Sequence, residues 1–298
     1  GIIVANKWMR ANYGEPLRKW FKQQPIKQII DFGDLPVFQN ATTYPCIIIS
    51  GKANSAGSIP AGGIAVNVKT LDFKNLQQYV TENTQLLAQE NFEDAGWNLG
   101  SETEQLLLKK LQHAGIPLGE YVKGKIYRGV LTGLNEAFVI DEATKDALIK
   151  EDAKSAEVIK PFLAGRDVKR YQVPVSNKFL IFTRRGIDIE KYPAIKKYLL
   201  QFKQQLMPKP KDWNGAEWKG RKPGSYLWYE MQDAVDYYEE FEKPKIIYPN
   251  ICKQPEFVYD ENEWYTNQKC FIISLEDKYL LGFLNSKLNA FLFEQYFT

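Results

Sequence analysis

The sequence predicts an α/β segment that is followed by a helical bridge and then by a larger α+β domain. Residues 1–50 combine short apolar, β-branched runs with one amphipathic helix, as buried strands and their covering helices do. Residues 116–298 consist mainly of short strand patterns separated by turns. With 298 residues, of which 44% are hydrophobic, the chain is long enough to bury two cores.

The elements of the first segment follow from its hydrophobic pattern. A short strand (GIIVAN) precedes a helix over residues 14–23, in which Leu17, Trp20 and Phe21 share one face. The runs IKQIIDFG and TYPCIIIS are then expected to form two buried strands. Because so few strands cannot form a complete doubly wound sheet, we expect this segment to be the last part of a sheet whose first strands lie further upstream.

Residues 51–115 are expected to form a linker and a helical bridge. Residues 51–63 hold four Gly together with Ser, Asn and Pro, which is typical of a linker or a surface loop. Helical patterns follow over residues 71–89 and again from Ser101, where Ser101 and Glu104 have the spacing of a capping box.

The pattern of residues 116–298 is that of short strands interrupted by two helices. The predicted strands lie at residues 127–133, 135–141, 178–184, 245–251, 256–261 and 269–274. The predicted helices cover residues 191–205 and 278–296. This alternation predicts an α+β domain rather than a parallel doubly wound sheet.

Several kinds of catalysis lack the residues that they need. The one histidine, His113, lies near the end of a helical pattern, so a metal site built on imidazoles and a catalytic histidine base are not expected. The loops GxxxxGK[ST], GxGxxG and GxSxG do not occur. The acidic stretch at residues 230–242 is expected to be an exposed helix or loop. We therefore assign no catalytic residue, no metal and no cofactor to the chain itself.

The cysteines and the hydropathy pattern indicate a cytoplasmic protein. Cys46, Cys252 and Cys270 lie in apolar or strand-like runs without CxxC spacing, so they are expected to be reduced, buried and structural. No uncharged apolar run reaches the length of about eighteen residues that a membrane helix needs, and the N-terminus does not have the pattern of a signal peptide. We expect a soluble protein without a membrane partner.

The distribution of charge points to nucleic acid. The chain has a formal net charge of +3, but residues 160–222 contain sixteen Lys and Arg against five Asp and Glu. This surplus of eleven positive charges means that the remainder carries a net charge of −8. Such a concentrated basic surface on an otherwise acidic chain favours a nucleic-acid partner over a merely solvated face.

We call residues 160–222 the basic window. Lys and Arg alternate there with planar side chains in three stretches, FLAGRDVKRY, FTRRG and WKGRKPGSYLWYEM, and each stretch contains a glycine. Arg can bind phosphate or grip guanine through two hydrogen bonds, whereas Lys mostly supplies point charge to the backbone. The predicted DNA contacts are therefore Arg166, Lys169, Arg170, Arg184, Arg185, Arg221 and Lys222, with Tyr226, Trp228 and Asn250 as weaker candidates.

Two further stretches, KIYRGVLTGLNEAFVIDEATKDALI and SAEVIKPFLAGRDVKRY, resemble the opening of the target-recognition domain of TaqI-type adenine-specific DNA methyltransferases, especially fused type IIG restriction-modification enzymes. Upstream, VANKWMRANYGEPLRKWF and IIDFGDLPVFQNATTYPCIII are similar to the closing strands and helix of the catalytic domain of these enzymes. Downstream, KPKIIYPNI and DKYLLGFLNSKLNAFLF resemble the end of the recognition domain.

The resemblance implies a fold and a division of the chain. Residues 1–50 would be the last strands of a Rossmann-like methyltransferase domain, residues 51–115 the bridge, and residues 116–298 an α+β target-recognition domain that binds double-stranded DNA. The family binds S-adenosylmethionine through a glycine-containing loop and holds the target adenine with an Asn-Pro-Pro-Tyr motif, and neither occurs here. We therefore expect a fragment, inactive by itself, whose partner is an upstream catalytic domain of the same polypeptide.

The resemblance also implies one residue on the catalytic side. The family carries an aromatic residue in a Val-Phe step between two late strands, and this residue packs against the base rotated out of the duplex. Val37 and Phe38 match that step, so Phe38 is the candidate, with Tyr44 as the second. An ordinary core phenylalanine is the alternative.

Two other interpretations stay open. A specificity subunit of a type I restriction system would also end in a similar LNS-containing helix, but it would need a second recognition domain and long coiled-coil spacers in place of the α/β segment. A phage-defence methyltransferase without nuclease activity is equally compatible with these residues.

Overall fold

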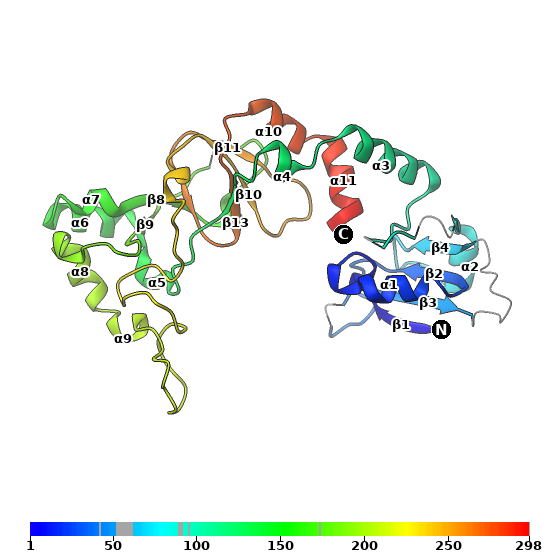
Figure 1. Ribbon diagram of the computed structural model, residues 1–298, viewed down its shortest axis with the longest axis horizontal. Helices are drawn as coiled ribbons and strands as arrows, with labels where there is room; N and C mark the ends of the chain where they lie inside the picture. The colour runs from blue at the N-terminus through cyan, green and yellow to red at the C-terminus, as the bar shows by residue number, and fades with distance from the viewer. Residues whose placement is uncertain (42, 52–61, 89–91, 95, 173, 298) are drawn as a thin grey trace. The chain divides into compact units, whose positions relative to one another are not determined.

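The computed structural model describes residues 1–41, 43–51, 62–88, 92–94, 96–172 and 174–297. The chain divides into two compact units, which are described separately (Figure 1). The first unit consists of Gly1–Gly115 with Phe291–Thr298, and the second of Ile116–Ala290. No helix in the part of the chain just given is long and apolar enough to cross a membrane.

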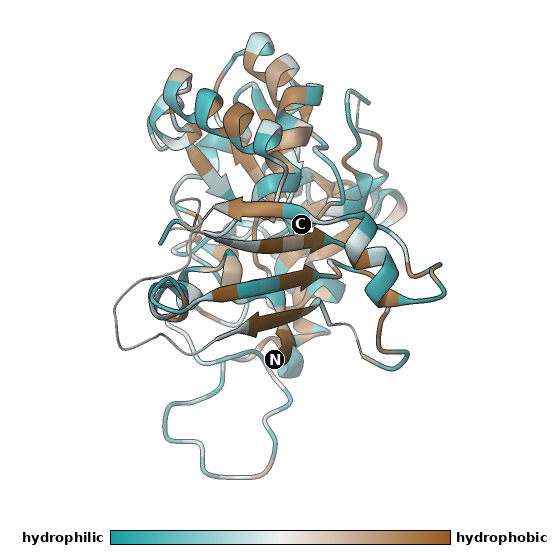
Figure 2. Cartoon of the chain, turned by 90° about the vertical axis from the view of Figure 1, so that its right-hand side faces the viewer, coloured by the Kyte–Doolittle hydropathy of each residue, from teal (hydrophilic) through white to brown (hydrophobic). Residues whose placement is uncertain are grey.

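The first unit is built on a mixed five-stranded sheet. Its strand order is β1 (Ile2–Ala5), β3 (Pro45–Ser50), β2 (Ile26–Asp31), β4 (Gly62–Asn67) and β5 (Gln85–Ala88). Strand β3 runs antiparallel to both of its neighbours, whereas β2 and β4 are parallel. Several of these strands consist largely of hydrophobic residues, coloured brown in Figure 2.

Residues 51–115 were expected to form a linker and a helical bridge, but part of this range forms strands β4 and β5 of the sheet. The run GGIAVN was assigned partly to a glycine-rich loop, but it forms a buried strand beside β2. At Gly63, a Cβ atom would lie 2.4 Å from the Ile26 carbonyl oxygen, so the glycine permits close backbone approach. The predicted helix at residues 71–89 is shorter, because α2 (Leu76–Glu82) ends before β5 begins. Residues 52–61 lie outside the described residues.

Helix α1 (Glu15–Phe21) presents a different face from the predicted one. Phe21 is buried, but Leu17 and Trp20 are 40% and 52% exposed. The side chain that accompanies Phe21 inward is Arg18, whose guanidinium donates hydrogen bonds to the Trp8, Ala11 and Asp94 carbonyl oxygens. These bonds compensate for burial of the charge and set the rotation of the helix.

Helix α3 (Glu102–Ala114) begins as its sequence predicts. The Ser101 amide donates to the Glu104 carboxylate at 2.7 Å, and the Glu104 amide donates to the Ser101 hydroxyl at 3.3 Å, which confirms the capping box. His113 is exposed in the last turn, next to the Gly115 cap.

The second unit contains two four-stranded sheets. The first has the order β11 (Val258–Asp260), β10 (Lys245–Pro249), β13 (Cys270–Ile273) and β6 (Ile126–Arg128). The other has the order β12 (Tyr265–Thr266), β8 (Ile159–Leu163), β9 (Lys178–Ile181) and β7 (Val139–Asp141). Its helices are α4 (Leu118–Tyr121), α5 (Asn135–Phe138), α6 (Glu142–Glu151), α7 (Ser155–Val158), α8 (Pro193–Leu200), α9 (Lys203–Leu206) and α10 (Lys278–Leu284), and α11 (Lys287–Phe297) continues into the first unit.

Several predicted elements of this unit are divided or shortened. The predicted strand at residues 135–141 begins as helix α5, and the sequence analysis did not identify α6. The predicted helix at residues 278–296 is broken at Asn285, whose buried side chain exchanges two hydrogen bonds with the Phe257 backbone. Ser286 then accepts a hydrogen bond from the Asn289 amide and begins α11. A side chain bonded to a distant strand therefore competes with continuation of the helix.

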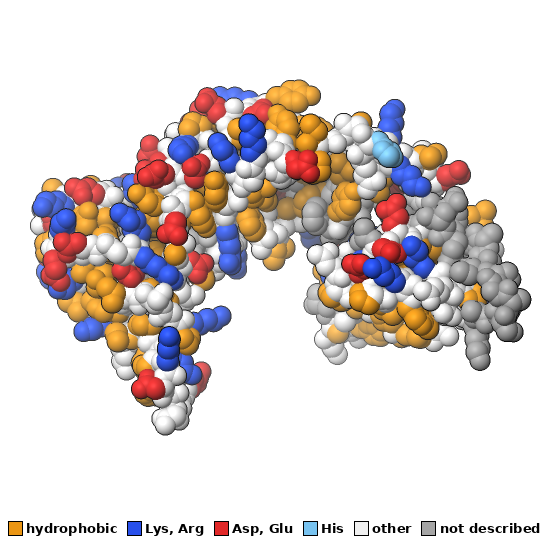
Figure 3. Space-filling model, viewed as in Figure 1, with side chains coloured by type: hydrophobic (Ala, Val, Ile, Leu, Met, Phe, Trp, Pro, Cys, Tyr) orange, Lys and Arg blue, Asp and Glu red, His pale blue; other side chains and the backbone are white. Residues whose placement is uncertain are grey.

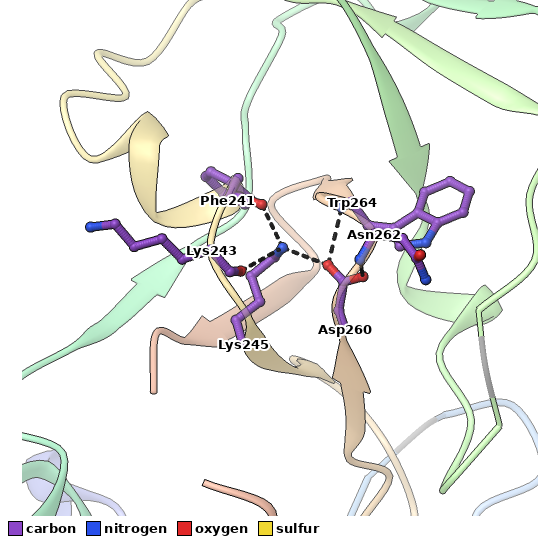
Figure 4. A network of polar contacts seen from close by, with 6 residues as sticks. All are labelled: Phe241, Lys243, Lys245, Asp260, Asn262 and Trp264. Atoms are coloured by element: carbon purple, nitrogen blue, oxygen red, sulfur yellow. Dashed lines mark hydrogen bonds and ion pairs between the residues drawn. The ribbon is translucent and has the colours of Figure 1, made fainter. Parts of the chain in front are cut away.

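A buried ion pair joins strands β10 and β11 (Figure 4). The Lys245 ammonium lies 2.5 Å from the Asp260 carboxylate, and both side chains are fully buried. Lys245 also donates to the Phe241 carbonyl oxygen, and the Asp260 carboxylate accepts from the Trp264 and Asn262 amides. Burial lowers the pKa of Lys245, and the Asp260 charge opposes that shift. Lys245 and Asp260 lie opposite each other in the register of the two strands, and their further hydrogen bonds compensate for the burial of both charges.

Candidate nucleic-acid interface

The basic window is only partly available as free positive charge. Around helix α8, Lys191, Lys196 and Lys197 each lie within 4.0 Å of a carboxylate oxygen, and Lys160 pairs with Glu242 at 2.8 Å. In Figure 3, blue and red side chains are correspondingly interspersed over this part of the second unit. The surplus of positive charge in the sequence therefore overstates the free charge of this face.

Arg221, a predicted DNA contact, lies in the interior and is 4% exposed. Its guanidinium donates five hydrogen bonds to backbone carbonyl oxygens and stacks over the Tyr226 ring at 4.4 Å. The acceptors belong to Thr132, Leu206, Leu227, Trp228 and Glu230 at distances of 2.7 to 3.2 Å. Burial lowers the pKa of Arg221 to about 10, so the group stays charged at neutral pH. We correct the prediction: Arg221 binds its own backbone and has no donor left for phosphate.

Tyr226 is also buried, and Trp228 is half-buried. Tyr226 is 3% exposed, and its hydroxyl donates to the Lys222 carbonyl oxygen. Trp228 is half-buried against the core, with the Lys203 ammonium 5.6 Å from its ring. Its burial shields Tyr226 from a base in this arrangement, whereas Trp228 keeps part of its surface exposed and stays a predicted DNA contact.

Glu230, at the start of the stretch that was expected to be exposed, is buried. Its carboxylate accepts hydrogen bonds from the Gly186 and Leu227 amides at 2.8 and 2.7 Å. Gly186 has φ +77°, a conformation that favours glycine, so the turn after Arg185 depends on both residues. The burial of Glu230 was not predicted, because a cluster of acidic residues in a sequence does not indicate which carboxylate is buried.

Three of the predicted contacts lie together beside this turn, and we call them the first basic patch: Arg184, Arg185 and Lys222. Arg184 is exposed over the Tyr238 ring at 5.1 Å, and Lys222 is also exposed. Arg185 donates to the Gln232 carbonyl oxygen at 2.7 Å and to the Ser225 hydroxyl at 3.3 Å. Ordered guanidinium groups at a surface lose little further freedom when they bind an anion.

The other predicted contacts form a second basic patch: Arg166, Lys169, Arg170 and Asn250. The 3₁₀ turn Gly165–Asp167 packs on β10, which ends one residue before Asn250. The Arg166 side chain is 77% exposed and lies 3.7 Å from the Asp167 carboxylate, and the Lys169 ammonium is 3.3 Å from the Glu256 carboxylate. Asn250 is exposed, and its backbone amide donates to the Lys269 carbonyl oxygen at 2.7 Å. The structure thus places seven of the predicted contacts in two surface patches, whereas Arg221 and Tyr226 are buried and Trp228 is half-buried.

Phe38 lies in the loop between β2 and β3 and is 45% exposed. The alternative of an ordinary core phenylalanine is not supported, because Phe32 occupies the core there and is 4% exposed. The start of the loop is held by the buried Asp31 carboxylate, which accepts hydrogen bonds from Asn6 and from the Gly33 amide. Tyr44, the second candidate, is half-buried beneath the Lys7 ammonium at 4.4 Å.

The cysteines form no disulfide. Cys46 and Cys270 are buried as predicted, and burial raises their thiol pKa values to about 11 and about 12. Cys252 is only half-buried, which corrects the expectation for this residue. Within the residues that the structure describes, no three His, Cys, Asp or Glu side chains are grouped as metal ligands would be.

Comparison with known proteins relates the chain to restriction-modification enzymes. Residues 160–298 match the family described as the TaqI-like C-terminal specificity domain, and residues 1–38 match the Eco57I restriction-modification methylase. The type II methyltransferase M.PaeR7I of Pseudomonas aeruginosa is 25% identical over 93% of the chain and 47% of its own length. The type II methyltransferase M.XhoI of Xanthomonas vasicola is 21% identical over 93% of the chain and 50% of its own length.

A solved structure shares the fold. The type IIL restriction-modification enzyme MmeI, in complex with DNA, aligns with 95% of this chain and 34% of its own, with a TM-score of 0.52 and 11% sequence identity. The chain spans about half the length of the two curated type II methyltransferases. Residues 160–298 are thus similar to the TaqI-like specificity domain, and most of the chain is similar to type II methyltransferases.

Arg221→Ala should lower the free energy of unfolding by about 3–5 kcal/mol, because it leaves several buried carbonyl groups unpaired at about 1–3 kcal/mol each. The neighbouring exposed Lys222 provides the control, and Lys222→Ala should change stability by no more than about 0.5 kcal/mol. Urea unfolding followed by tryptophan fluorescence measures both variants. Equal stability of the two variants would show that the Arg221 guanidinium is not part of the interior.

Proposed function

Starting from this relationship, we propose that the chain is the DNA target-recognition part of an adenine-specific methyltransferase of a restriction-modification system. In this role the second unit binds double-stranded DNA and reads a particular base sequence, and the first unit completes the catalytic domain. The observation that carries the proposal is the coincidence of the specificity-domain match, residues 160–298, with both basic patches.

The two patches suit different tasks in such a complex. In protein–DNA interfaces generally, Lys and Arg contacts to phosphate set position, whereas hydrogen bonds to base edges set sequence preference. Arg184 and Arg166 are exposed and can reach either kind of group, and Asn250 offers an amide that suits adenine. Lys169 and Lys222 supply charge to the DNA backbone in this proposal.

The exposed edge of the first unit's sheet, formed by β1, is suited to pack against another domain. Strand β1 is an edge strand of this sheet and pairs with β3. Its Ile2 and Ile3 side chains are 57% and 53% exposed. Apolar side chains on an edge strand favour association with another element of sheet or helix. We assign that partner to the upstream catalytic domain of the same polypeptide, so that β1–β3 are the last strands of a Rossmann-like sheet.

The hollow beside Trp97 in the first unit is small for S-adenosylmethionine. It is lined by Arg10, Trp97, Gln105 and neighbouring residues, and has a volume of about 150 Å³. Pockets for cofactor-sized ligands usually measure about 300–1,000 Å³. In this proposal, S-adenosylmethionine is bound by the catalytic domain, where it supplies the methyl group.

Phe38 is proposed to stack on the target adenine after the base leaves the duplex. Its exposure in a loop whose start is fixed by Asp31 is compatible with contact to an extruded base. The type I specificity subunit is disfavoured, because it would need a second recognition domain in place of the α/β sheet of the first unit.

The chain should bind duplex DNA with a strong dependence on salt, because neutralised phosphates release condensed counterions. Arg184→Ala with Lys222→Ala should lower the magnitude of the log–log salt slope by about 0.9 for each phosphate contact that is lost. Fluorescence anisotropy with a labelled duplex measures the slope. Lys243→Ala with Lys278→Ala removes equal charge from carboxylate-paired lysines outside the basic window and should leave the slope unchanged. An absence of binding by the unaltered chain at low salt would refute the proposal.

Phe38→Ala, made in the complete methyltransferase, should slow methylation roughly 10- to 100-fold, because base stacking contributes about 1–3 kcal/mol and each 1.36 kcal/mol is tenfold in rate. Its melting temperature should stay near that of the unaltered enzyme. The buried Phe32 is the contrasting position, where Phe32→Ala should cost about 3–5 kcal/mol of stability. A thermally normal Phe38→Ala enzyme with full activity would remove the stacking role from Phe38, and Tyr44 would be tested next.

A further inference from the structure

The first unit holds two arginines that are close in sequence but differ in their partners. The Arg18 guanidinium is buried and donates hydrogen bonds to three backbone carbonyl oxygens. Arg10 is half-buried, and its side chain forms no hydrogen bond or ion pair with any residue that the structure describes. A guanidinium that is withdrawn from water normally gains acceptors in exchange, as Arg18 does. Arg10 therefore has donors that the described part of the chain does not satisfy.

The backbone of Arg10 is nevertheless fixed on both sides. Arg18 donates to carbonyl oxygens just before and just after it, and the Met9 carbonyl oxygen accepts from the Trp97 amide at 2.7 Å. These bonds leave the position of the residue well defined while its guanidinium has no partner of its own. The side chain is thus suited to hold another group rather than to support the fold.

The Arg10 side chain lines the hollow of about 150 Å³ in the first unit. Trp97 and Gln105 are the buried residues of the lining, and Lys109 and Glu93 are exposed residues of it. This volume is several times what one water molecule needs. The hollow therefore has room for a small ion of several non-hydrogen atoms.

Two residues of this lining carry a buried N–H group without an acceptor. The Nε atom of Arg10 and the Nε1 atom of Trp97 are both withdrawn from solvent and have no hydrogen-bond partner among the described residues. Both groups can only donate. The Gln105 side-chain amide, by contrast, donates to the Gly100 carbonyl oxygen at 2.8 Å. The unsatisfied groups of the lining are donors, so a ligand that fits them carries oxygen acceptors.

The charges around Arg10 are compatible with an anion. Burial lowers the pKa of Arg10, and the Asp31 charge opposes that shift. The two groups form no ion pair, and the Asp31 carboxylate already accepts two hydrogen bonds from other groups. In the lining itself, Arg10 and Lys109 are positive and Glu93 is negative, which leaves a surplus of one positive charge.

We propose that this hollow binds a small oxyanion, a phosphate or a carboxylate group, through the Arg10 guanidinium and the Trp97 indole N–H. Such an anion offers several acceptor oxygens, and charge-assisted hydrogen bonds are shorter and stronger than those between neutral groups. The bound anion connects the turn at Arg10 with helix α3, which supplies Gln105. This site goes beyond DNA recognition, because no residue of either basic patch lines the hollow.

Calorimetric titration of this chain with sodium phosphate tests the site, in buffers whose ionic strength is matched with sodium chloride. The unaltered chain should show saturable binding of phosphate. Arg10→Gln should weaken the affinity at least about tenfold, because it removes a charge-assisted hydrogen bond. Arg128→Gln makes the same change at an exposed guanidinium outside the hollow and outside both basic patches, and it should bind phosphate as the unaltered chain does.

Arg10→Lys is the second variant, because it keeps the positive charge but lacks the Nε–H group and the planar arrangement of donors. It should also weaken phosphate binding, and it decides the question if Arg10→Gln does not fold, which circular dichroism shows. Acetate added to the phosphate titration separates the two sources of oxyanion. Displacement of phosphate shows that the site accepts carboxylates, and acetate without effect restricts the site to phosphate.

Two results would overturn the inference. Absence of saturable phosphate binding by the unaltered chain would mean that the hollow holds water alone. Phosphate affinity that is unchanged in folded Arg10→Gln, or in Arg10→Lys where the first variant does not fold, would place the anion elsewhere, such as on the basic patches. None of these measurements uses DNA, so either result leaves the proposed function in place.

Discussion

The five hydrogen bonds that the Arg221 guanidinium donates to backbone carbonyl groups hold together the part of the second unit on which the first basic patch depends. Three backbone segments that are distant in the sequence, near Thr132, Leu206 and residues 227–230, converge on this one side chain. A buried guanidinium is costly unless every donor is satisfied, so the segments must keep their positions for the charge to be tolerated. The turn at Arg185 and Gly186 is bound to the same region through Glu230. The buried Arg221 guanidinium therefore helps to hold the first basic patch in position.

The structure distinguishes three roles of Lys and Arg side chains that cannot be told apart in the sequence. Arg221 and Arg18 are bonded to backbone in the interior, the lysines around α8 pair with carboxylates, and the patches retain exposed guanidinium and ammonium groups. Among the patch residues, Lys169 pairs with Glu256 and Arg185 donates to the Gln232 carbonyl oxygen, whereas Arg184 and Lys222 can meet a phosphate without first losing a carboxylate or carbonyl partner among the described residues. The affinity for a polyanion should therefore depend on few of the basic residues, and their positions are set by the others.

The sequence predicted the local features that depend on near neighbours. The capping box at Ser101 and the position of strand β10 are examples, because both follow from residues a few positions apart. The inward rotation of Arg18, the burial of Arg221 and the break at Asn285 depend on hydrogen bonds to distant carbonyl or amide groups. No periodic pattern reports such contacts. In the same way, GGIAVN was assigned to a loop by its glycines, although those glycines allow β4 to approach β2.

The proposed function requires that the second unit reads base sequence and does not merely attract DNA. Selection from a random duplex library tests it most directly: the purified chain is mixed with the library at physiological salt, bound molecules are amplified through several rounds, and the products are sequenced. The account predicts enrichment of one short consensus that contains an adenine, because exposed Arg and Asn side chains can distinguish base pairs at about 1–3 kcal/mol each. Bound pools that stay random in sequence, at any salt concentration that permits binding, would contradict it.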